Sequence, residues 1–189
     1  MKKIEEKLQN FKGLILDADG VWFSGSENRL VMPSGEVVIM KERDLQDGQG
    51  LSFLRAIGIK VVFASGEEEP LESTVEKINA LPSVKSGDWE PVTLFTKEFN
   101  KGGKVASIEA WMKTQKLLWE ECAYVGDDRT DLEAMSLVGL KVAPQNATRL
   151  IKKIADIELS KNGGGGAVRE FSELVLDARG IDEATLPSA

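Results

Sequence analysis

Gly13-Leu14-Ile15-Leu16-Asp17-Ala18-Asp19-Gly20 is the stretch that decides the fold of this 189-residue chain. It reads as a short apolar strand that ends in two acids and a glycine. Side chains two positions apart on a strand point to the same side, so Asp17 and Asp19 should project together from its end. Two close carboxylates repel each other, and a divalent cation between them removes that penalty. A plain acidic turn after a strand is the other interpretation, and this stretch alone leaves both open.

Strands alternate with helices through most of the chain. The continuously apolar run at 59–64 is typical of a strand buried on both faces of a parallel sheet. Such alternation predicts an α/β fold, a doubly wound parallel sheet, in one domain spanning 1–189. Further strands are predicted at 13–16, 123–125 and 139–142, and helices at 47–57, 70–80, 104–115, 131–137, 148–155 and 167–178.

Residues 21–44 interrupt the alternation. Segments 28–32 and 36–41 are extended in character and rich in Val, Ile and Met, and Pro33-Ser34-Gly35 between them is a turn signal. The pattern predicts a small β-hairpin. Its apolar content is high for an isolated excursion, so we expect it to pack against another surface, such as a neighbouring subunit.

Three other segments carry mainly turn and loop signals. Residues 84–103 predict a short strand followed by a longer loop, because they include Pro91 and a Gly102-Gly103 pair. The four glycines at 163–166 predict a flexible loop. The last ten residues predict a loose tail.

The composition excludes several classes of function. The chain has no histidine, which excludes Ser-His-Asp and Cys-His mechanisms and the usual His-containing zinc sites. Its net charge of -7 argues against nucleic acid as the main partner. We find neither 18 consecutive apolar residues nor the apolar core of a signal peptide, so no membrane span is expected. The single cysteine, Cys122, excludes an internal disulfide and makes a cytoplasmic protein the simplest expectation.

Polar side chains follow three of the predicted strands. Asp17, Ser65 and Asp127 each come directly after a strand or its closing glycine. The carboxyl ends of parallel strands form the ligand-binding edge of such sheets, so these side chains should converge on one rim. Magnesium prefers oxygen ligands. One half of a magnesium site would come from Asp17 and Asp19, and the other half from Asp127, Asp128 and Asp131.

Each of these residues also has a plainer interpretation. One acid after Gly126 is enough to cap a helix, although three are not needed for that purpose. Ser65 can donate to a phosphate oxygen or serve as a turn residue. Lys104 can neutralise a phosphate or lie solvated on the surface. The glycines at 163–166 can cradle an anion or form a mobile loop. The two acid clusters together favour the metal site.

These motifs, in this order, resemble the haloacid dehalogenase (HAD) phosphatase superfamily. Within it, residues 11–178 resemble the family of 3-deoxy-D-manno-octulosonate 8-phosphate (KDO 8-phosphate) phosphatases. The closer resemblance is carried by Asp17-Ala18-Asp19-Gly20-Val21-Trp22, Asp47-Gly48-Gln49-Gly50, Tyr124-Val125-Gly126-Asp127-Asp128 and Gly163-Gly164-Gly165-Gly166-Ala167-Val168-Arg169-Glu170.

The resemblance implies a role for each matching residue. Asp17 would be the nucleophile that forms an aspartyl-phosphate, and Asp19 would be the general acid and base. Mg²⁺ would be bound by Asp17, the Asp19 carbonyl and Asp127, with Asp128 and Asp131 around them. The phosphoryl oxygens would be held by Ser65 and Lys104. The substrate, a phosphorylated sugar acid, would be contacted by Asp47, Gly48, Gly66, Glu67, Lys77 and Arg169.

The resemblance also implies an assembly. The hairpin at 21–44 would replace a cap domain and build a homotetramer, and the segment 163–189 of one subunit would help to close a neighbour's site.

The substrate itself is left open by departures from the family pattern. KDO 8-phosphate members usually continue the second motif with Gly-Arg, whereas this chain has Ser65-Gly66-Glu67. The acid and Trp22 suit the branch that hydrolyses nonulosonate 9-phosphates, such as KDN 9-phosphate. However, Lys77 is the only basic residue in 70–80, where that pattern leads us to expect more.

A non-enzymatic alternative comes from a second resemblance. Segments 108–111 and 118–121 are similar to the phosphatase-like domain joined to some sialic-acid cytidylyltransferases, a module that mainly serves assembly and has lost catalytic residues. Retention of the acids and the lysine favours an enzyme here: Asp17, Asp19, Lys104 and Asp127.

Overall fold

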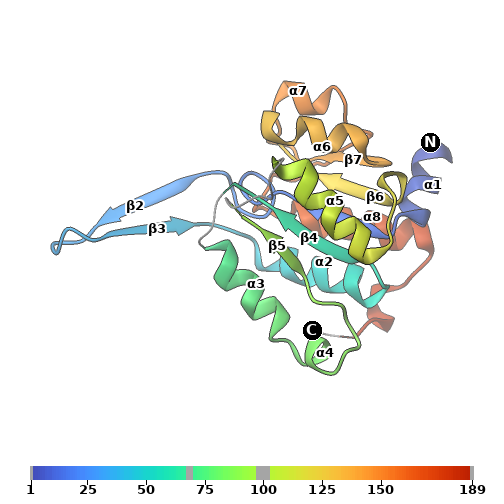
Figure 1. Cartoon of the computed structure of the whole chain (residues 1–189), viewed down its shortest axis with the longest axis horizontal. Coiled ribbons are helices and arrows are strands. Elements are labelled where there is room, and N and C mark those ends of the chain that lie inside the picture. Colours follow the sequence, from blue (N-terminus) through green and yellow to red (C-terminus); the bar gives the residue numbers. More distant parts are fainter. Residues whose placement is uncertain (1, 67–69, 97–102, 188–189) are drawn as a thin grey trace.

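The computed structural model describes residues 2–66, 70–96 and 103–187, which form an α/β body with a projecting hairpin (Figure 1). The body contains a six-stranded sheet in the order β5-β4-β1-β6-β7-β8, and every neighbouring pair is parallel. The predicted doubly wound parallel sheet is confirmed. Its strands are β1 (Gly13–Leu16), β4 (Lys60–Ala64), β5 (Thr93–Phe95), β6 (Cys122–Val125), β7 (Leu140–Ala143) and β8 (Ile157–Glu158).

Strand β1 marks the switch point of the sheet. The chain continues from β1 to β4 on one side and returns to β6 on the other, so Leu14 lies opposite both Val61 and Ala123. All four residues of β1 are buried. In open α/β sheets, ligands bind where the strand order reverses, beyond the carboxyl ends of the strands. Asp17 stands at that place.

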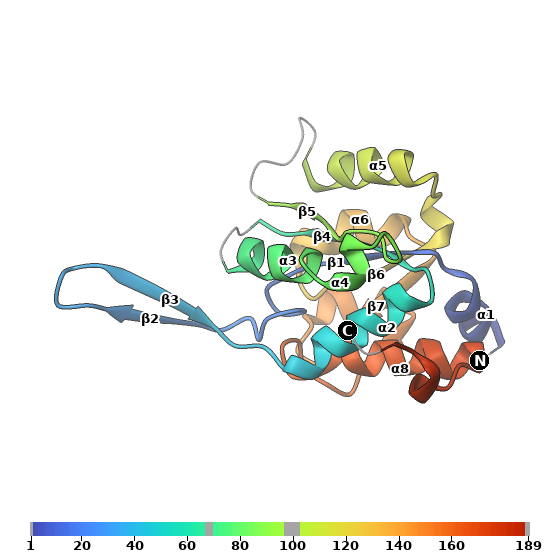
Figure 2. The same cartoon turned by 90° about the horizontal axis from the view of Figure 1, so that it is seen from below.

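Helices cover both faces of the sheet (Figure 2). Leu14 and Leu16 pack into the core shared with α2 and α8, whereas Ile15 packs into the core shared with α5 and α6. This alternation follows from the two-residue period of a strand. The helices are α1 (Lys2–Asn10), α2 (Leu45–Ala56), α3 (Leu71–Asn79), α4 (Pro82–Lys85), α5 (Gly103–Gln115), α6 (Leu132–Leu137), α7 (Arg149–Lys152) and α8 (Ala167–Arg179), with 3-10 turns η1 (Trp119–Glu121), η2 (Arg129–Asp131) and η3 (Glu183–Thr185).

The predicted hairpin is present. Strands β2 (Glu27–Val31) and β3 (Val37–Lys41) pair antiparallel and project away from the body (Figure 1). All of β2 and most of β3 are exposed to solvent. The exposed apolar side chains of this hairpin are Leu30, Val31, Met32, Val37, Val38, Ile39 and Met40.

The glycine-rich segment at 163–166 is packed, so the prediction of a flexible loop is wrong. Gly163 donates its backbone N–H to Asn146 Oδ1 (2.6 Å), and Gly164 donates to the carbonyl of Val21 (2.9 Å). A Cβ atom on Gly163 would lie 1.9 Å from the carbonyl oxygen of Gly20. Glycine is therefore used here because two backbones meet, not because the chain must move.

The predicted loose tail is also wrong as far as residue 187. Helix α8 ends at Arg179 and is capped by Gly180, whose φ of +65° is the left-handed conformation that glycine adopts readily. The turn η3 follows, and Glu183 within it pairs with Arg169 of α8.

Within the described ranges, we find no helix with the length and apolar character that a membrane crossing requires.

Candidate active site

The predicted polar residues converge at the carboxyl ends of the central strands. They line a cavity of about 550 Å³. Its walls come from the segments that follow β1, β4 and β6 and from the start of α5. The lining residues are Asp17, Asp19, Gly20, Gly25, Ser65, Gly66, Lys104, Asp127, Asp128 and Thr130.

Lys104 ties two of the acids together. Its ammonium lies 2.9 Å from Asp17 Oδ1 and 2.7 Å from Asp131 Oδ1, and its side chain is nearly buried. An ammonium has three donors, so two such bonds leave one N–H for a further acceptor in the cavity. The two carboxylates raise the pKa of Lys104 above its ordinary value and outweigh the opposing effect of burial. Lys104 is thus held charged beside Asp17.

Asp131 supports the surrounding loop. It is fully buried, and Oδ1 accepts from Lys104 and from the hydroxyl of Tyr124 (2.7 Å). Oδ2 accepts from the backbone N–H groups of Asp127 (3.0 Å) and Asp128 (3.2 Å). Both oxygens are therefore already occupied by donors. This arrangement fits a residue that shapes the site more than one that offers an open ligand position.

Asp127 has the opposite environment. Its Oδ1 is buried and has no hydrogen-bond partner among the described residues. Oxygens of Asp17, Asp127 and Asp131 lie within 4.8 Å of one another. A buried carboxylate oxygen without a partner is costly, and a hard divalent cation would supply the missing positive charge. The donor set, which contains only oxygen atoms, therefore fits a metal site formed by Asp17 and Asp127.

The closeness of these buried carboxylates raises the pKa values of two of them. Burial, and then repulsion from Asp131, raises the pKa of Asp17 from 3.8 to about 7, although Lys104 opposes the change. Burial, and then repulsion from Asp17, raises the pKa of Asp127 from 3.8 to about 7. Without a cation, both carboxyl groups therefore favour their protonated forms up to neutral pH.

The metal-free protein should lose stability between pH 4 and pH 7. In that window the folded chain keeps protons on Asp17 and Asp127 that the unfolded chain has released. The contribution of these two protonated groups to the free energy of unfolding is fully present below about pH 4, and it disappears as the pH rises through about 7. We expect the free energy of unfolding to fall by several kcal/mol, and each kcal/mol lowers Tm by roughly 2–4 °C in a chain of this size.

Thermal unfolding in EDTA at pH 5 and pH 8 measures this loss. Asp127→Asn is the matched control, because it removes one of the two titrating groups and should flatten the dependence. A divalent cation at pH 8 should restore most of the lost stability. An unchanged or rising Tm between pH 5 and pH 8 in EDTA would contradict the expectation.

Gly20 is a site residue that the sequence analysis placed in a motif but gave no role. Its φ is +80°, and a Cβ atom built on it would lie 2.0 Å from Asp127 Oδ2. The residue is therefore glycine for two reasons: its conformation, and the carboxylate that rests against its Cα. The sequence feature that could have pointed to Gly20 is its position directly after the two acids, Asp17 and Asp19. Thr130 and Gly25 were also missed; only their nearness to predicted site residues could have pointed to them.

Four predicted substrate contacts lie outside this cavity. Asp47 is fully buried, and its carboxylate accepts the backbone N–H groups of Arg169 (2.8 Å) and Gly166 (3.2 Å) at the start of α8. Gly48 follows it in α2 and does not reach the cavity. Arg169 pairs with Glu173 and Glu183. Lys77 is exposed on α3, and Glu67 lies outside the described residues.

Comparison with known proteins identifies the family. The model of the haloacid dehalogenase-like hydrolases matches residues 41–171. The KDO 8-phosphate phosphatase of Haemophilus influenzae is 31% identical over 178 residues, which cover 94% of this chain and 89% of that protein. The chain belongs to the KDO 8-phosphate phosphatase family. The family's enzymes are phosphoric monoester hydrolases of the HAD type, in agreement with the resemblance in the sequence.

Solved structures of the KDO 8-phosphate phosphatase family and its neighbours have the same fold. A HAD subfamily III A hydrolase from Legionella pneumophila superposes with a TM-score of 0.79 at 30% identity and covers 95% of this chain and 90% of its own. The KDO 8-phosphate phosphatase of Moraxella catarrhalis, solved with magnesium, phosphate and KDO, gives a TM-score of 0.76 at 26% identity. It covers 95% of this chain and 94% of its own.

Proposed function

We propose that this chain is a Mg²⁺-dependent phosphatase that hydrolyses a phosphorylated 2-keto-3-deoxy sugar acid through an aspartyl-phosphate. The observation that carries the proposal is the arrangement around Asp17. Lys104 lies against this carboxylate, and Asp127, whose buried Oδ1 has no hydrogen-bond partner among the described residues, lines the same cavity. A nucleophilic carboxylate needs such positive partners, because burial otherwise favours its protonated form.

In the first half of the reaction, an oxygen of Asp17 attacks phosphorus while the bond from phosphorus to the sugar oxygen breaks. Asp19 gives its proton to that oxygen, so the sugar leaves as an alcohol. In the second half, Asp19 takes a proton from water as the water oxygen bonds to phosphorus. The bond between Asp17 and phosphorus then breaks, which releases phosphate and restores the carboxylate.

The remaining residues act on charge and orientation. When bound by Asp17, Asp127 and the carbonyl of Asp19, Mg²⁺ would offset the negative charge of the phosphoryl group. Lys104 has one donor left to bind a phosphoryl oxygen, and Ser65 lines the same cavity after β4. Asp131 keeps Lys104 and the Asp127 backbone in place.

Two substrates remain in competition under this proposal: KDO 8-phosphate and a nonulosonate 9-phosphate such as KDN 9-phosphate. Phosphate release from both compounds, from N-acetylneuraminate 9-phosphate and from a generic aryl phosphate tests the function. We expect Mg²⁺-dependent turnover of one sugar-acid phosphate at a kcat/KM at least about 10-fold above the others. If Glu67 selects the longer sugar, Glu67→Arg should shift the ratio toward KDO 8-phosphate. Absence of Mg²⁺-dependent turnover on the whole panel would contradict the proposal.

Assembly is the second part of the proposal. The exposed apolar side chains of β2 and β3 form a surface that a monomeric protein rarely leaves open, and they support a homotetramer built by the hairpins. Light scattering measures the mass, and a monomer would contradict this part alone. A purely structural module, like the domain joined to sialic-acid cytidylyltransferases, would give the tetramer without turnover. Closure of a neighbour's site by 163–189 remains a prediction.

A further inference from the structure

Among the described residues, an ion pair joins the hairpin to the loop that carries Asp19. Lys41 is the last residue of β3, and its ammonium lies 2.8 Å from Asp19 Oδ1 and 2.7 Å from Asp19 Oδ2. The Lys41 side chain is only 5% exposed, whereas that of Asp19 is 34% exposed. Both carboxylate oxygens accept from one charged donor, and when one oxygen carries a proton, the other can still accept from Lys41. The Asp19 side chain therefore cannot turn freely without weakening this contact.

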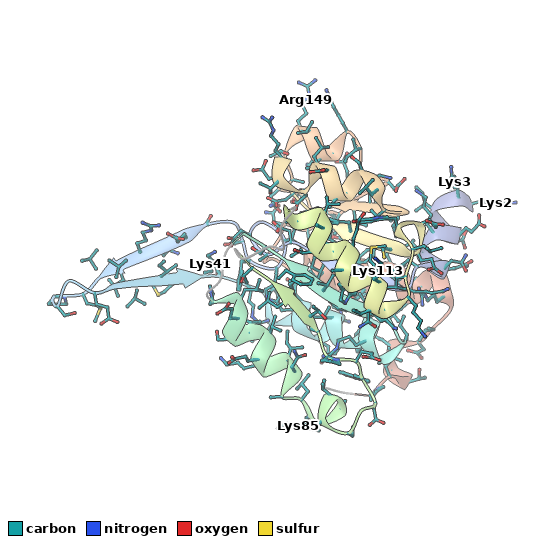
Figure 3. All side chains as sticks on the ribbon, viewed as in Figure 1. Lys2, Lys3, Lys41, Lys85, Lys113 and Arg149 are labelled. Carbon is teal, nitrogen blue, oxygen red and sulfur yellow. The ribbon has the colours of Figure 1, made fainter. Side chains whose placement is uncertain are left out.

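The base of the hairpin is tied to the loop that carries Asp19. The backbone N–H of Ser24 donates to the carbonyl of Glu42 (2.9 Å), which closes the two legs of the hairpin next to Lys41. Phe23 forms a parallel bridge with Asp19, and the Lys41 ammonium lies 5.9 Å from the Phe23 ring centroid. Figure 3 places Lys41 where the hairpin meets the body. Lys41 is thus anchored on the same loop that it restrains.

Lys41 is distinct from the lysine of the reaction centre. Lys104 contacts Asp17 and Asp131 and lines the cavity, whereas Lys41 contacts Asp19 and is absent from the cavity wall. From this position, the ammonium can act on the reaction through its contact with Asp19. A general acid works when its oxygen is aimed at the departing atom, and small errors in that aim reduce the rate strongly.

We propose that Lys41 is a positioning residue, which holds the Asp19 carboxyl group for proton transfer and couples its orientation to the hairpin. The inference rests on the proposed function, because it assigns Asp19 to that proton transfer. Lys41 is not among the residues assigned to the reaction above, which are Asp17, Asp19, Ser65, Lys104 and Asp127. It also makes the base of the hairpin part of the catalytic apparatus.

The dependence on the leaving group tests the proposal. A sugar oxygen needs a proton to depart, whereas p-nitrophenolate departs without one. In rapid acid-quench experiments, Lys41→Met should slow phosphoenzyme formation from the preferred sugar-acid phosphate about 10–100-fold, and from p-nitrophenyl phosphate less than about 3-fold. KM for the sugar phosphate should stay within about 3-fold of wild type, because Lys41 is nearly buried and does not line the cavity. Lys41→Arg, which keeps a charged donor, should recover most of the rate.

Two further variants keep the result interpretable. Lys113→Met makes the same substitution on α5, at a lysine that Figure 3 places on the body away from the hairpin, and should leave both rates unchanged. In an Asp19→Asn background, Lys41→Met should cost nothing further, because its effect passes through Asp19. This cycle separates positioning from a general loss of folding, which would slow the double variant again.

The possible outcomes test the role of Lys41 and the proposed function separately. Equal losses on both substrates, a full additional loss in the Asp19→Asn background, or a KM effect without a rate effect would each overturn the role of Lys41. Wild-type protein that turns over neither compound would instead overturn the proposed function.

Discussion

Asp17→Asn should lower phosphatase activity at least about 10³-fold and at the same time stabilise the metal-free protein at pH 8. The amide matches the carboxylate in size, and its oxygen can still accept from Lys104, which lies 2.9 Å from Asp17 Oδ1. It is too weak a nucleophile to form an acyl phosphate. The buried negative charge that repels Asp131 and Asp127 disappears with the substitution. Activity and stability are therefore expected to move in opposite directions.

The measurements are phosphate release with Mg²⁺, acid-quench trapping of the phosphoenzyme, and thermal unfolding in EDTA. Asp156→Asn is the matched control. Asp156 accepts from Lys7 Nζ (2.7 Å) and from the backbone N–H of Lys141 (2.9 Å), and it does not line the cavity. Its substitution should cost about 1 kcal/mol of stability and leave turnover unchanged. Phosphoenzyme formation by Asp17→Asn at the wild-type rate would show that the nucleophile is another residue.

Gly20→Ala should weaken Mg²⁺ binding about 10–100-fold, without removing any ligand. The new Cβ would occupy space 2.0 Å from Asp127 Oδ2, so the carboxylate or the loop must shift. Asp127 Oδ1 has no hydrogen-bond partner among the described residues and is the proposed ligand, so this shift would displace the metal. At limiting Mg²⁺, kcat/KM should fall by a similar factor, and high Mg²⁺ should restore part of it.

Gly58→Ala separates the steric effect from backbone strain. Gly58 has a φ of +83°, close to that of Gly20, but a Cβ atom there meets nothing within 4 Å. It should therefore lose about 1 kcal/mol of stability while metal affinity stays at the wild-type value. Activity titrations with Mg²⁺ and calorimetric binding measure both variants. Equal Mg²⁺ affinity in Gly20→Ala and wild type would contradict the metal assignment of Asp127.

The sheet and the rim of the site could be predicted from the sequence, because their signals are local. Buried parallel strands are short apolar runs, and the rule that ligands bind at their carboxyl ends needs only strand order along the chain. That reasoning brought Asp17, Ser65 and Asp127 to one cavity, as the structure confirms. The hairpin was equally local, with two extended segments around a Pro-Ser-Gly turn.

The remaining features depend on contacts between distant residues, which no local pattern encodes. Lys41 and Asp19 are 22 positions apart, and only the geometry of the hairpin base brings them together. Asp47 stands in a motif that implied a substrate contact, yet its carboxylate accepts from the start of α8, where Gly166 lies 119 positions away from Asp47. Glycines at 163–166 have the composition of a mobile loop. A glycine-rich composition fits a mobile loop and a segment packed against another backbone equally well.

That contact between backbones sets an order of events during synthesis. The loop that carries Asp17 and Asp19 is made well before Gly163, whose backbone packs on Gly20. Closing so long a loop is slow, since its entropic cost precedes any contact. The emerging chain therefore carries Asp17 and Asp19 well before the segment that encloses them exists. We therefore expect the site to be complete only once the segment before α8 has packed on Gly20.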